Sequence, residues 1–333
     1  MNSIRMALPE KTERFAENYH SIRKHFIWHE PMIKRLVSLV YALDDKDIDL
    51  DKITYCHNLM KAETGIFSTF RGNLAIYVAA MLALDYDPYK RFTDTLEAYN
   101  LLKGEKFWAS DYLVASAYEV ARWGGQKGLK NVAVRAMQFY RGLKANHRFH
   151  IGQDDYIFVV MLALSDIEVS DGVDRVKQIF MRLRPEFFSR NSALYLAQML
   201  VLSGKGEDSV DDVLHLNRML KQQGIRLNKT YTLPSLGVLS MLDTDHSAMA
   251  NAIDDTMAAL RRIRGFGRFS VSKQELLMHV VAIVSSVYLN GLDDVAKASL
   301  STNITNLIIA QQAAMLGACV GASVAASSAA ASC

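Results

Sequence analysis

Several residue types that mark particular protein classes are scarce in this chain of 333 residues. Proline occurs five times and glycine eighteen times, so few residues interrupt helices. The three cysteines, Cys56, Cys319 and Cys333, are odd in number and match no zinc-binding spacing. The sequence therefore excludes a disulfide framework, and we expect the protein in a reducing compartment.

Familiar catalytic and targeting motifs are also missing. There is no Walker A sequence, no Gly-x-Gly-x-x-Gly, no Gly-x-Ser-x-Gly and no His-Glu-x-x-His. These absences remove only the familiar enzyme classes, so enzymatic activity stays open; a protein that is not an enzyme is the favoured expectation, and no cofactor is expected. Residues 1–10 contain no apolar stretch of signal-peptide length, which predicts a cytoplasmic location. The net charge of +3 is too small to indicate nucleic-acid binding by itself.

A four-residue motif, called here the recurring phrase, repeats every 37 to 42 residues along the chain. It consists of a large apolar residue, two variable residues and a residue that favours helix starts. The second member is always of a type suited to a helix N-cap. The six pairs are Phe70 with Asn73, Phe107 with Ser110, Phe149 with Gly152, Phe188 with Asn191, Leu227 with Thr230, and Phe269 with Ser272.

Two kinds of helix follow these phrases in alternation. The first is apolar almost all round and is expected to be buried, as in 74–84, 156–164, 193–202 and 276–289. The second has a single apolar stripe, as in Val173, Val176, Ile179 and Leu183, and is expected to face water. Each such pair buries its apolar surface only when stacked on other pairs.

We therefore predict an all-α protein of about six tandem helix hairpins over residues 66–302. Residues 1–65 are expected to form an N-terminal cap of three helices, roughly 9–29, 31–43 and 46–62. Residues 303–333, rich in alanine and serine, are expected to form a C-terminal helix and tail that is too weakly hydrophobic to span a membrane. The pattern favours an open solenoid or bundle resembling tetratricopeptide or HEAT repeats, and a closed α/α toroid is the alternative.

The starts of the apolar helices collect polar and aromatic residues that could form a ligand-binding edge. We call them the helix-start set. Helix capping would explain the same residues. The set is Arg71, Asn73, Trp108, Asp111, His150, Asp154, Asp155, Arg190, Asn191, Lys229, Tyr231 and Glu275.

Two weaker patterns have chemical interpretations. His25 and His29 lie one helical turn apart and could share a metal ion, although a complete site needs further ligands. Basic residues gather in two clusters that could contact RNA, although basic residues near helix ends are also ordinary. The clustered arginines used to test that hypothesis are Arg135, Arg141, Arg148, Arg261 and Arg264.

The segment GIFSTFRGNLAIYVAAMLAL (65–84) and the segment DPYKRFTDTLEAYNLL that follows it resemble a family of helical bacterial proteins, domain of unknown function 4003. The Ala/Ser-rich end, NLIIAQQAAMLGACVGASVAASSAAAS, resembles the end of the same family. The resemblance covers most of the chain from about residue 10 onward. It implies a cytoplasmic bacterial protein and carries no catalytic residue to any position here.

Three functional hypotheses follow. The first is a non-enzymatic interaction protein that presents a protein- or peptide-binding surface. The second is a small-molecule-binding protein or enzyme with its site at the N-terminal ends of the inner, apolar helices. The third, RNA binding through the basic clusters, has the least support, and neither nucleic acid nor a membrane is the expected partner.

Overall fold

A computed structural model describes residues 2–146, 151–228, 232–242 and 244–290. Within these ranges the chain forms fourteen α-helices, two short 3₁₀ helices and no strand, which confirms the all-α prediction. The first seven α-helices are α1 (Asn2–His25), α2 (Pro31–Leu43), α3 (Leu50–Glu63), α4 (Ala75–Leu84), α5 (Pro88–Gly104), α6 (Asp111–Trp123) and α7 (Leu129–Asn146). The others are α8 (Tyr156–Leu164), α9 (Val169–Leu183), α10 (Arg190–Leu202), α11 (Ser209–Gln222), α12 (Ser235–Leu239), α13 (His246–Arg262) and α14 (Lys273–Asn290). The 3₁₀ helices are η1 (Thr69–Arg71) and η2 (Gln153–Asp155).

Side-chain caps fix several helix starts. Ser110 accepts a hydrogen bond from the backbone N–H of Leu113 at 3.2 Å, and Ser272 accepts one from that of Glu275 at 3.1 Å. Asp87 accepts one from the N–H of Lys90 at 3.0 Å, with proline at the first helical position. Each cap satisfies a donor that the helix itself leaves without a partner.

Two of the predicted caps are wrong. The residue that caps α10 is Ser189, two residues before Asn191, and it accepts from the N–H of Ser192 at 3.3 Å. Asn73 does not cap α4, because α4 begins only at Ala75 and its N-cap position falls on Leu74, which makes no side-chain cap hydrogen bond. Serine competes well with asparagine as a cap, so a spacing rule alone does not select between neighbouring candidates.

Buried and amphipathic helices alternate along the chain, as the apolar patterns predict. Every residue of α4 from Ala75 to Ala83 is buried, and so is every residue of α10 from Ser192 to Val201. The odd-numbered helices bury one stripe only, such as Val132, Ala136, Phe139 and Leu143 in α7. The even-numbered helices thus form the core, and the odd-numbered helices cover it.

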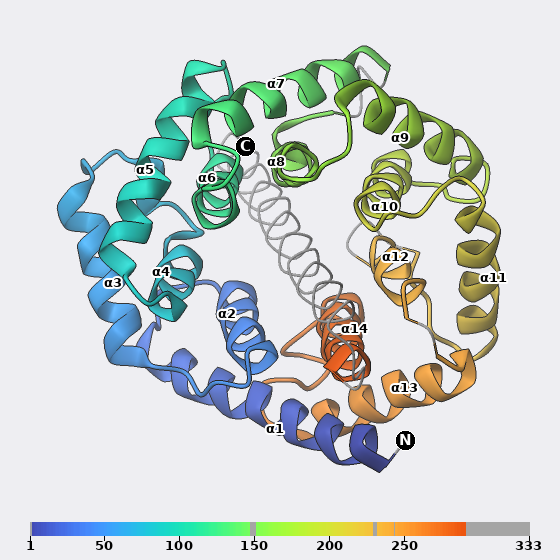
Figure 1. The fold of residues 1–333 in the computed structure, drawn as a ribbon. Coiled ribbons are helices and arrows are strands. Elements are labelled where there is room, and N and C mark those ends of the chain that lie inside the picture. The colour runs from blue at the N-terminus through green and yellow to red at the C-terminus, as the bar shows by residue number, and fades with distance from the viewer. Residues whose placement is uncertain (1, 147–150, 229–231, 243, 291–333) are drawn as a thin grey trace, which may run out of the picture. The chain divides into compact units, whose positions relative to one another are not determined.

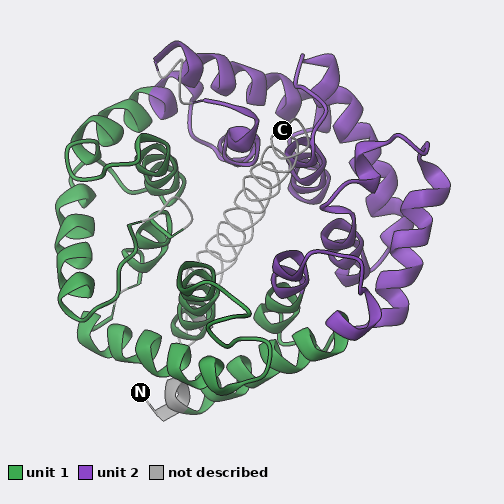
Figure 2. Cartoon of the chain, turned by 180° about the vertical axis from the view of Figure 1, so that it is seen from behind, with its two compact units in different colours: residues 1–22, 38–48, 174–309 green, residues 23–37, 49–173, 310–333 purple. Residues whose placement is uncertain are grey.

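The contacts divide the chain into two compact units, coloured separately in Figure 2. Unit 2 contains residues 23–37, 49–173 and 310–333, and unit 1 contains 1–22, 38–48 and 174–309. The first two helices match the expected positions closely and the third begins at Leu50, whereas the predicted segment 303–333 lies outside the described residues.

Within unit 2, α3 packs on α4, α5 on α6 and α7 on α8. Figure 1 shows α3, α5 and α7 following one another, with α4, α6 and α8 along one side of that row. Within unit 1, α12 packs on α10 and α14, while α13 packs on α14 and α11. The backbone of Gly237 in α12 lies so close to α10 that an added Cβ would meet Leu196 and Met199 at 3.2 Å.

A cation on an odd-numbered helix donates to a carbonyl at or shortly after the C-terminal end of the next even-numbered helix, and among the described residues this contact occurs five times. Carbonyl groups at a helix end have no partner within the helix and carry partial negative charge. The pairs are Lys11 with Ala42 and Leu43, Lys52 with Asp85, Arg91 with Ala121, Arg135 with Ala163 and Ser165, and Arg175 with Lys205. The first pair joins α1 to α2, so the predicted N-terminal cap contains the same contact as the helices that follow.

No described helix is long enough and apolar enough to cross a bilayer. The apolar helices α4 and α8 have ten and nine residues, against the roughly 20 residues that a membrane-spanning helix needs.

Replacing Arg135 should destabilise the protein because its guanidinium donates to three carbonyls at and just after the C-terminal end of α8, those of Ala163, Ser165 and Ile167. We expect Arg135→Met to lower the free energy of unfolding by about 2 kcal/mol, the scale of hydrogen bonds from a charged group. Urea unfolding followed by circular dichroism measures this. Arg141→Met, on an exposed position of the same helix, is the control and should change little; equal losses in both variants would contradict the capping role.

Candidate functional site

Large aromatic side chains are exposed in the segments that precede five of the buried helices. Their relative exposures lie between 74% and 108%. Surface aromatic residues mark interaction sites when they gather, although isolated ones are ordinary. The exposed residues are Trp28 before α2, Phe67 before α4, Trp108 before α6, Phe188 before α10 and Phe269 before α14.

In the same segments a neighbouring apolar residue is buried. Phe107 is buried beside the exposed Trp108, and its ring meets that of Tyr156 edge-on at 4.8 Å. Phe187 is buried beside the exposed Phe188. Each segment therefore places one apolar side chain in the core and another in solvent.

The recurring phrase did not distinguish these two positions. Phe70 and Phe107 are buried as their place in the phrase suggests, but Phe188 and Phe269 are fully exposed. Phe187 takes the buried place before α10, because the helix starts two residues earlier than the phrase implies.

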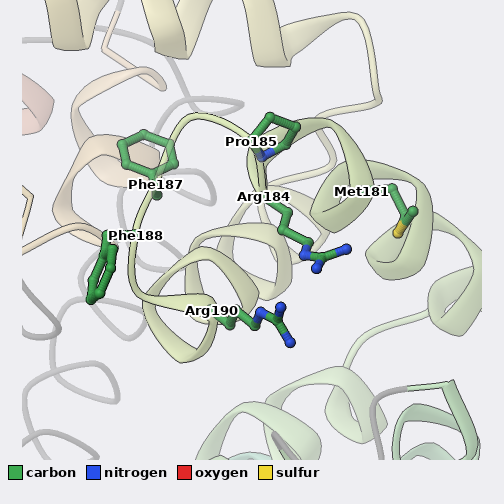
Figure 3. A pocket seen from close by; sticks show the side chains of 6 residues that line it. All are labelled: Met181, Arg184, Pro185, Phe187, Phe188 and Arg190. Carbon is green, nitrogen blue, oxygen red and sulfur yellow. The ribbon is translucent and has the colours of Figure 1, made fainter.

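A hollow of about 410 Å³ lies in unit 1, where α9 ends and α10 begins. Figure 3 shows the guanidinium groups of Arg184 and Arg190 on the same side of the connecting segment, toward Met181. The aromatic rings of Phe187 and Phe188 lie on its other side. The lining residues are Met181, Arg184, Pro185, Phe187, Phe188 and Arg190. Two cations, no anion and several apolar groups thus line one concave surface.

Among the described residues, neither Arg184 nor Arg190 takes part in a salt bridge. Arg182, between Met181 and Leu183 in the same helix, does: it pairs with Asp211 at 2.7 Å and donates to the carbonyl of Glu207 at 2.8 Å. The arginines of the hollow are therefore available to an external anion, and Arg182 is occupied by α11.

The helix-start set of unit 2 mostly serves the fold. Asp111 accepts hydrogen bonds from Asn73 and from the backbone N–H of Leu74, and burial raises the pKa of its carboxyl. Its Oδ1 would lie 2.3 Å from a Cβ added to Gly72, so glycine is needed there for close approach. Arg71 donates to the carbonyls of Lys61 and Thr64 at the end of α3.

The other members in unit 2 follow the same pattern. Asp155 is fully buried and accepts from the N–H of Gly152 at 2.8 Å. The N–H of Trp108 donates to the Tyr156 hydroxyl at 3.2 Å, while its indole ring stays exposed. These contacts join one helix start to the next rather than enclosing a ligand.

In unit 1 the structure places Arg190 in the hollow and leaves Asn191 exposed at the start of α10. Glu275 is buried near the start of α14, with its Oε1 3.8 Å from His279 Nε2. His150, Lys229 and Tyr231 lie outside the described residues.

The predicted metal pair does not gain a third ligand among the described residues, which contain no group of three or more histidine, cysteine or acidic side chains placed to hold a metal ion. His25 Nε2 instead lies 3.2 Å from Thr54 Oγ1. The ring of His29 lies 5.6 Å from that of His57. Burial and the nearby Lys61 lower the pKa of His57 to about 4, and burial and Lys34 lower that of His29.

A buried charged cluster between α4, α5 and α6 was not anticipated. Asp85 accepts from Arg91 Nε at 3.0 Å, and its Oδ2 lies 2.8 Å from the Tyr118 hydroxyl. Glu119 is buried beside Arg122 and accepts from the Trp123 indole N–H at 3.1 Å. The sequence signal was a glutamate within the apolar run of α6.

Burial raises the pKa of the Glu119 carboxyl, and the Arg122 guanidinium opposes that shift. Arg122 in turn lies over the Trp123 ring at 4.8 Å. Such perturbed groups also occur in active sites, but the hollow described above lies elsewhere. The cluster ties the ends of α4 and α6 to α5.

The arginines expected to contact RNA are partly engaged within the fold. Arg135 donates to the carbonyls at and just after the end of α8, and Arg261 donates to those of Phe266 and Val271 at 2.9 Å each. Their guanidinium groups are therefore not free to bind phosphate. Arg141 is exposed, and Arg148 lies outside the described residues.

His57 should make the stability depend on pH. Its pKa is about 4 in the folded protein and 6.5 as a model value, so below pH 6.5 the unfolded chain binds a proton that the folded chain does not. The free energy of unfolding should therefore not depend on His57 above pH 6.5, and it should fall as the pH drops from 6.5 toward 4. The loss should be on the order of 1–2 kcal/mol, allowing for partial solvent exposure.

Urea unfolding at a series of pH values tests this, because His57→Gln should flatten the fall between pH 6.5 and 4. His215→Gln, at an exposed position of α11, is the control. This variant should show the same fall in stability between pH 6.5 and 4 as the unaltered protein. A pH profile that His57→Gln leaves unchanged would disprove the assignment.

Comparison with known proteins adds the family. A family model described as "Protein of unknown function (DUF4003)" matches residues 18–313, well over half of the chain. No curated protein matches. No solved structure matches. The chain belongs to the DUF4003 family of proteins of unknown function.

Proposed function

We propose that this protein is a non-enzymatic helical-repeat protein of the bacterial cytoplasm whose surface binds peptide segments of partner proteins. The observation that carries the proposal is Phe188, which is fully exposed at the edge of the hollow between α9 and α10. Exposed aromatic side chains provide much of the binding energy of protein interfaces, because they bury a large area at little cost in conformational entropy.

The form of the hollow supports a peptide over a small molecule. All six lining residues come from one stretch of ten residues, Met181–Arg190. A single stretch provides one wall and does not surround a ligand, whereas small-molecule pockets typically enclose 70–90% of their ligand's surface. A peptide gains further contacts along the surface beyond the hollow.

The recurring cation contact supports the repeat part of the proposal. Five odd-numbered helices carry a lysine or arginine that donates to a carbonyl at or shortly after the end of the following even-numbered helix, at separations of 28 to 33 residues. Repeat proteins stack such units and bind partners along the surface that the stack creates.

The other two hypotheses stay predictions with less support. A small-molecule or catalytic site at the helix starts would use Asp111 and Asp155, which already accept hydrogen bonds from the backbone N–H groups of Leu74 and Gly152. RNA binding would use Arg135 and Arg261, which already donate to carbonyls.

Peptide selection tests the proposal. A random peptide display library is panned on the intact protein, and enriched peptides are measured by isothermal titration calorimetry. We expect Phe188→Ser to weaken binding by roughly tenfold or more, the scale of an interface hot spot.

The matched control is Phe269→Ser, which removes an equally exposed aromatic side chain outside the hollow. It should bind within about twofold of the unaltered protein, because residues outside a hot spot contribute little. Failure to enrich any peptide, or equal losses in the two variants, would overturn the proposal.

A further inference from the structure

The charges around the hollow are all of one sign. Arg184 and Arg190 are the two ionic residues of the lining, and both are exposed. Glu186, between them in the sequence, does not line the hollow. An electropositive concave surface with apolar walls favours a ligand that is both acidic and apolar.

The two arginines also have room to bind carboxylates in the strongest geometry. A guanidinium group donates two parallel hydrogen bonds to one carboxylate, which neither lysine nor a backbone N–H can do. Arg184 follows the end of α9 and Arg190 begins α10, and Figure 3 shows their side chains on one side of the segment. One ligand segment can therefore reach both.

The apolar contacts lie next to these cations. Phe188 is fully exposed and Met181 is 56% exposed, so each has surface that a partner would remove from water. Phe187 is held in the core and keeps the segment in place. Methionine adapts to side chains of different shape, which suits a site that anchors an apolar residue.

We propose that the hollow lined by residues 181–190 binds an acidic peptide segment, with carboxylates on Arg184 and Arg190 and an apolar side chain against Phe188 and Met181. This inference rests on the peptide-binding function proposed above. A peptide is preferred over a nucleic acid or an anionic membrane, because the apolar wall and the two cations occupy one small hollow and do not extend as a basic face.

Three labelled peptides test the charge requirement by fluorescence anisotropy on the full chain. In each a tryptophan is flanked by glutamates, by glutamines or by lysines. The glutamate peptide should bind the unaltered protein on the order of tenfold more tightly than the glutamine peptide, and raised salt should reduce the difference.

Variants then assign the preference to the hollow. Arg184→Glu with Arg190→Glu should reverse it, so that the lysine peptide binds best. The matched control, Arg218→Glu with Lys221→Glu, changes the same total charge on exposed positions of α11 and should leave the preference unchanged. Arg184→Lys should lose part of the affinity, because lysine keeps the charge without the bidentate geometry.

The outcomes separate the two proposals. Equal affinity for glutamate and glutamine peptides, with loss in Phe188→Ser, would overturn the acidic specificity and keep peptide binding. Absence of binding to all three peptides, while anionic phosphatidylserine vesicles or a single-stranded RNA bind in an Arg184- and Arg190-dependent way, would overturn both. An equal reversal in the α11 control would also overturn the assignment to this hollow.

Discussion

The structure depends on satisfying the ends of helices that have no polar face. A helix such as α4 buries nearly every side chain, so its last carbonyl groups also lie close to apolar surroundings. Unpaired buried carbonyls cost free energy comparable to a lost hydrogen bond. Cations from the preceding amphipathic helix meet this requirement at four helix ends, from Lys11 at the end of α2 to Arg135 at the end of α8.

This arrangement explains why so many charged side chains belong to the fold. Arg91 both pairs with Asp85 and donates to the carbonyl of Ala121, so it holds two buried helices at once. Long basic side chains suit the role, because their apolar stems cross the core surface while the charged ends reach the carbonyls. Arg184 and Arg190 do not belong to this set of capping cations, and both line the hollow.

The opposite ends of the buried helices follow a different rule. Their starts are satisfied by short side chains of their own segment, such as Ser110 and Ser189, or by the next helix, as Asp111 does for Leu74. Since capping uses small polar groups, the large residues of the same segments are divided between core and solvent. Phe187 and Phe188 illustrate the division, and the exposed member is the one that supports a binding function.

The sequence by itself determined the helical class and the alternation of buried and amphipathic helices, because both are written in local apolar periodicity. It placed the apolar helices within a few residues: 156–164 coincides with α8, and 193–202 falls inside α10. Only the tertiary structure decided which cations serve the fold and which face a hollow. Arg135 lies in an amphipathic helix and Arg184 directly after one, and among the described residues only Arg135 of these two donates to carbonyls about 30 residues away. The same holds for adjacent aromatic residues, since a shift of the α10 cap from Asn191 to Ser189 selects Phe187 for the core.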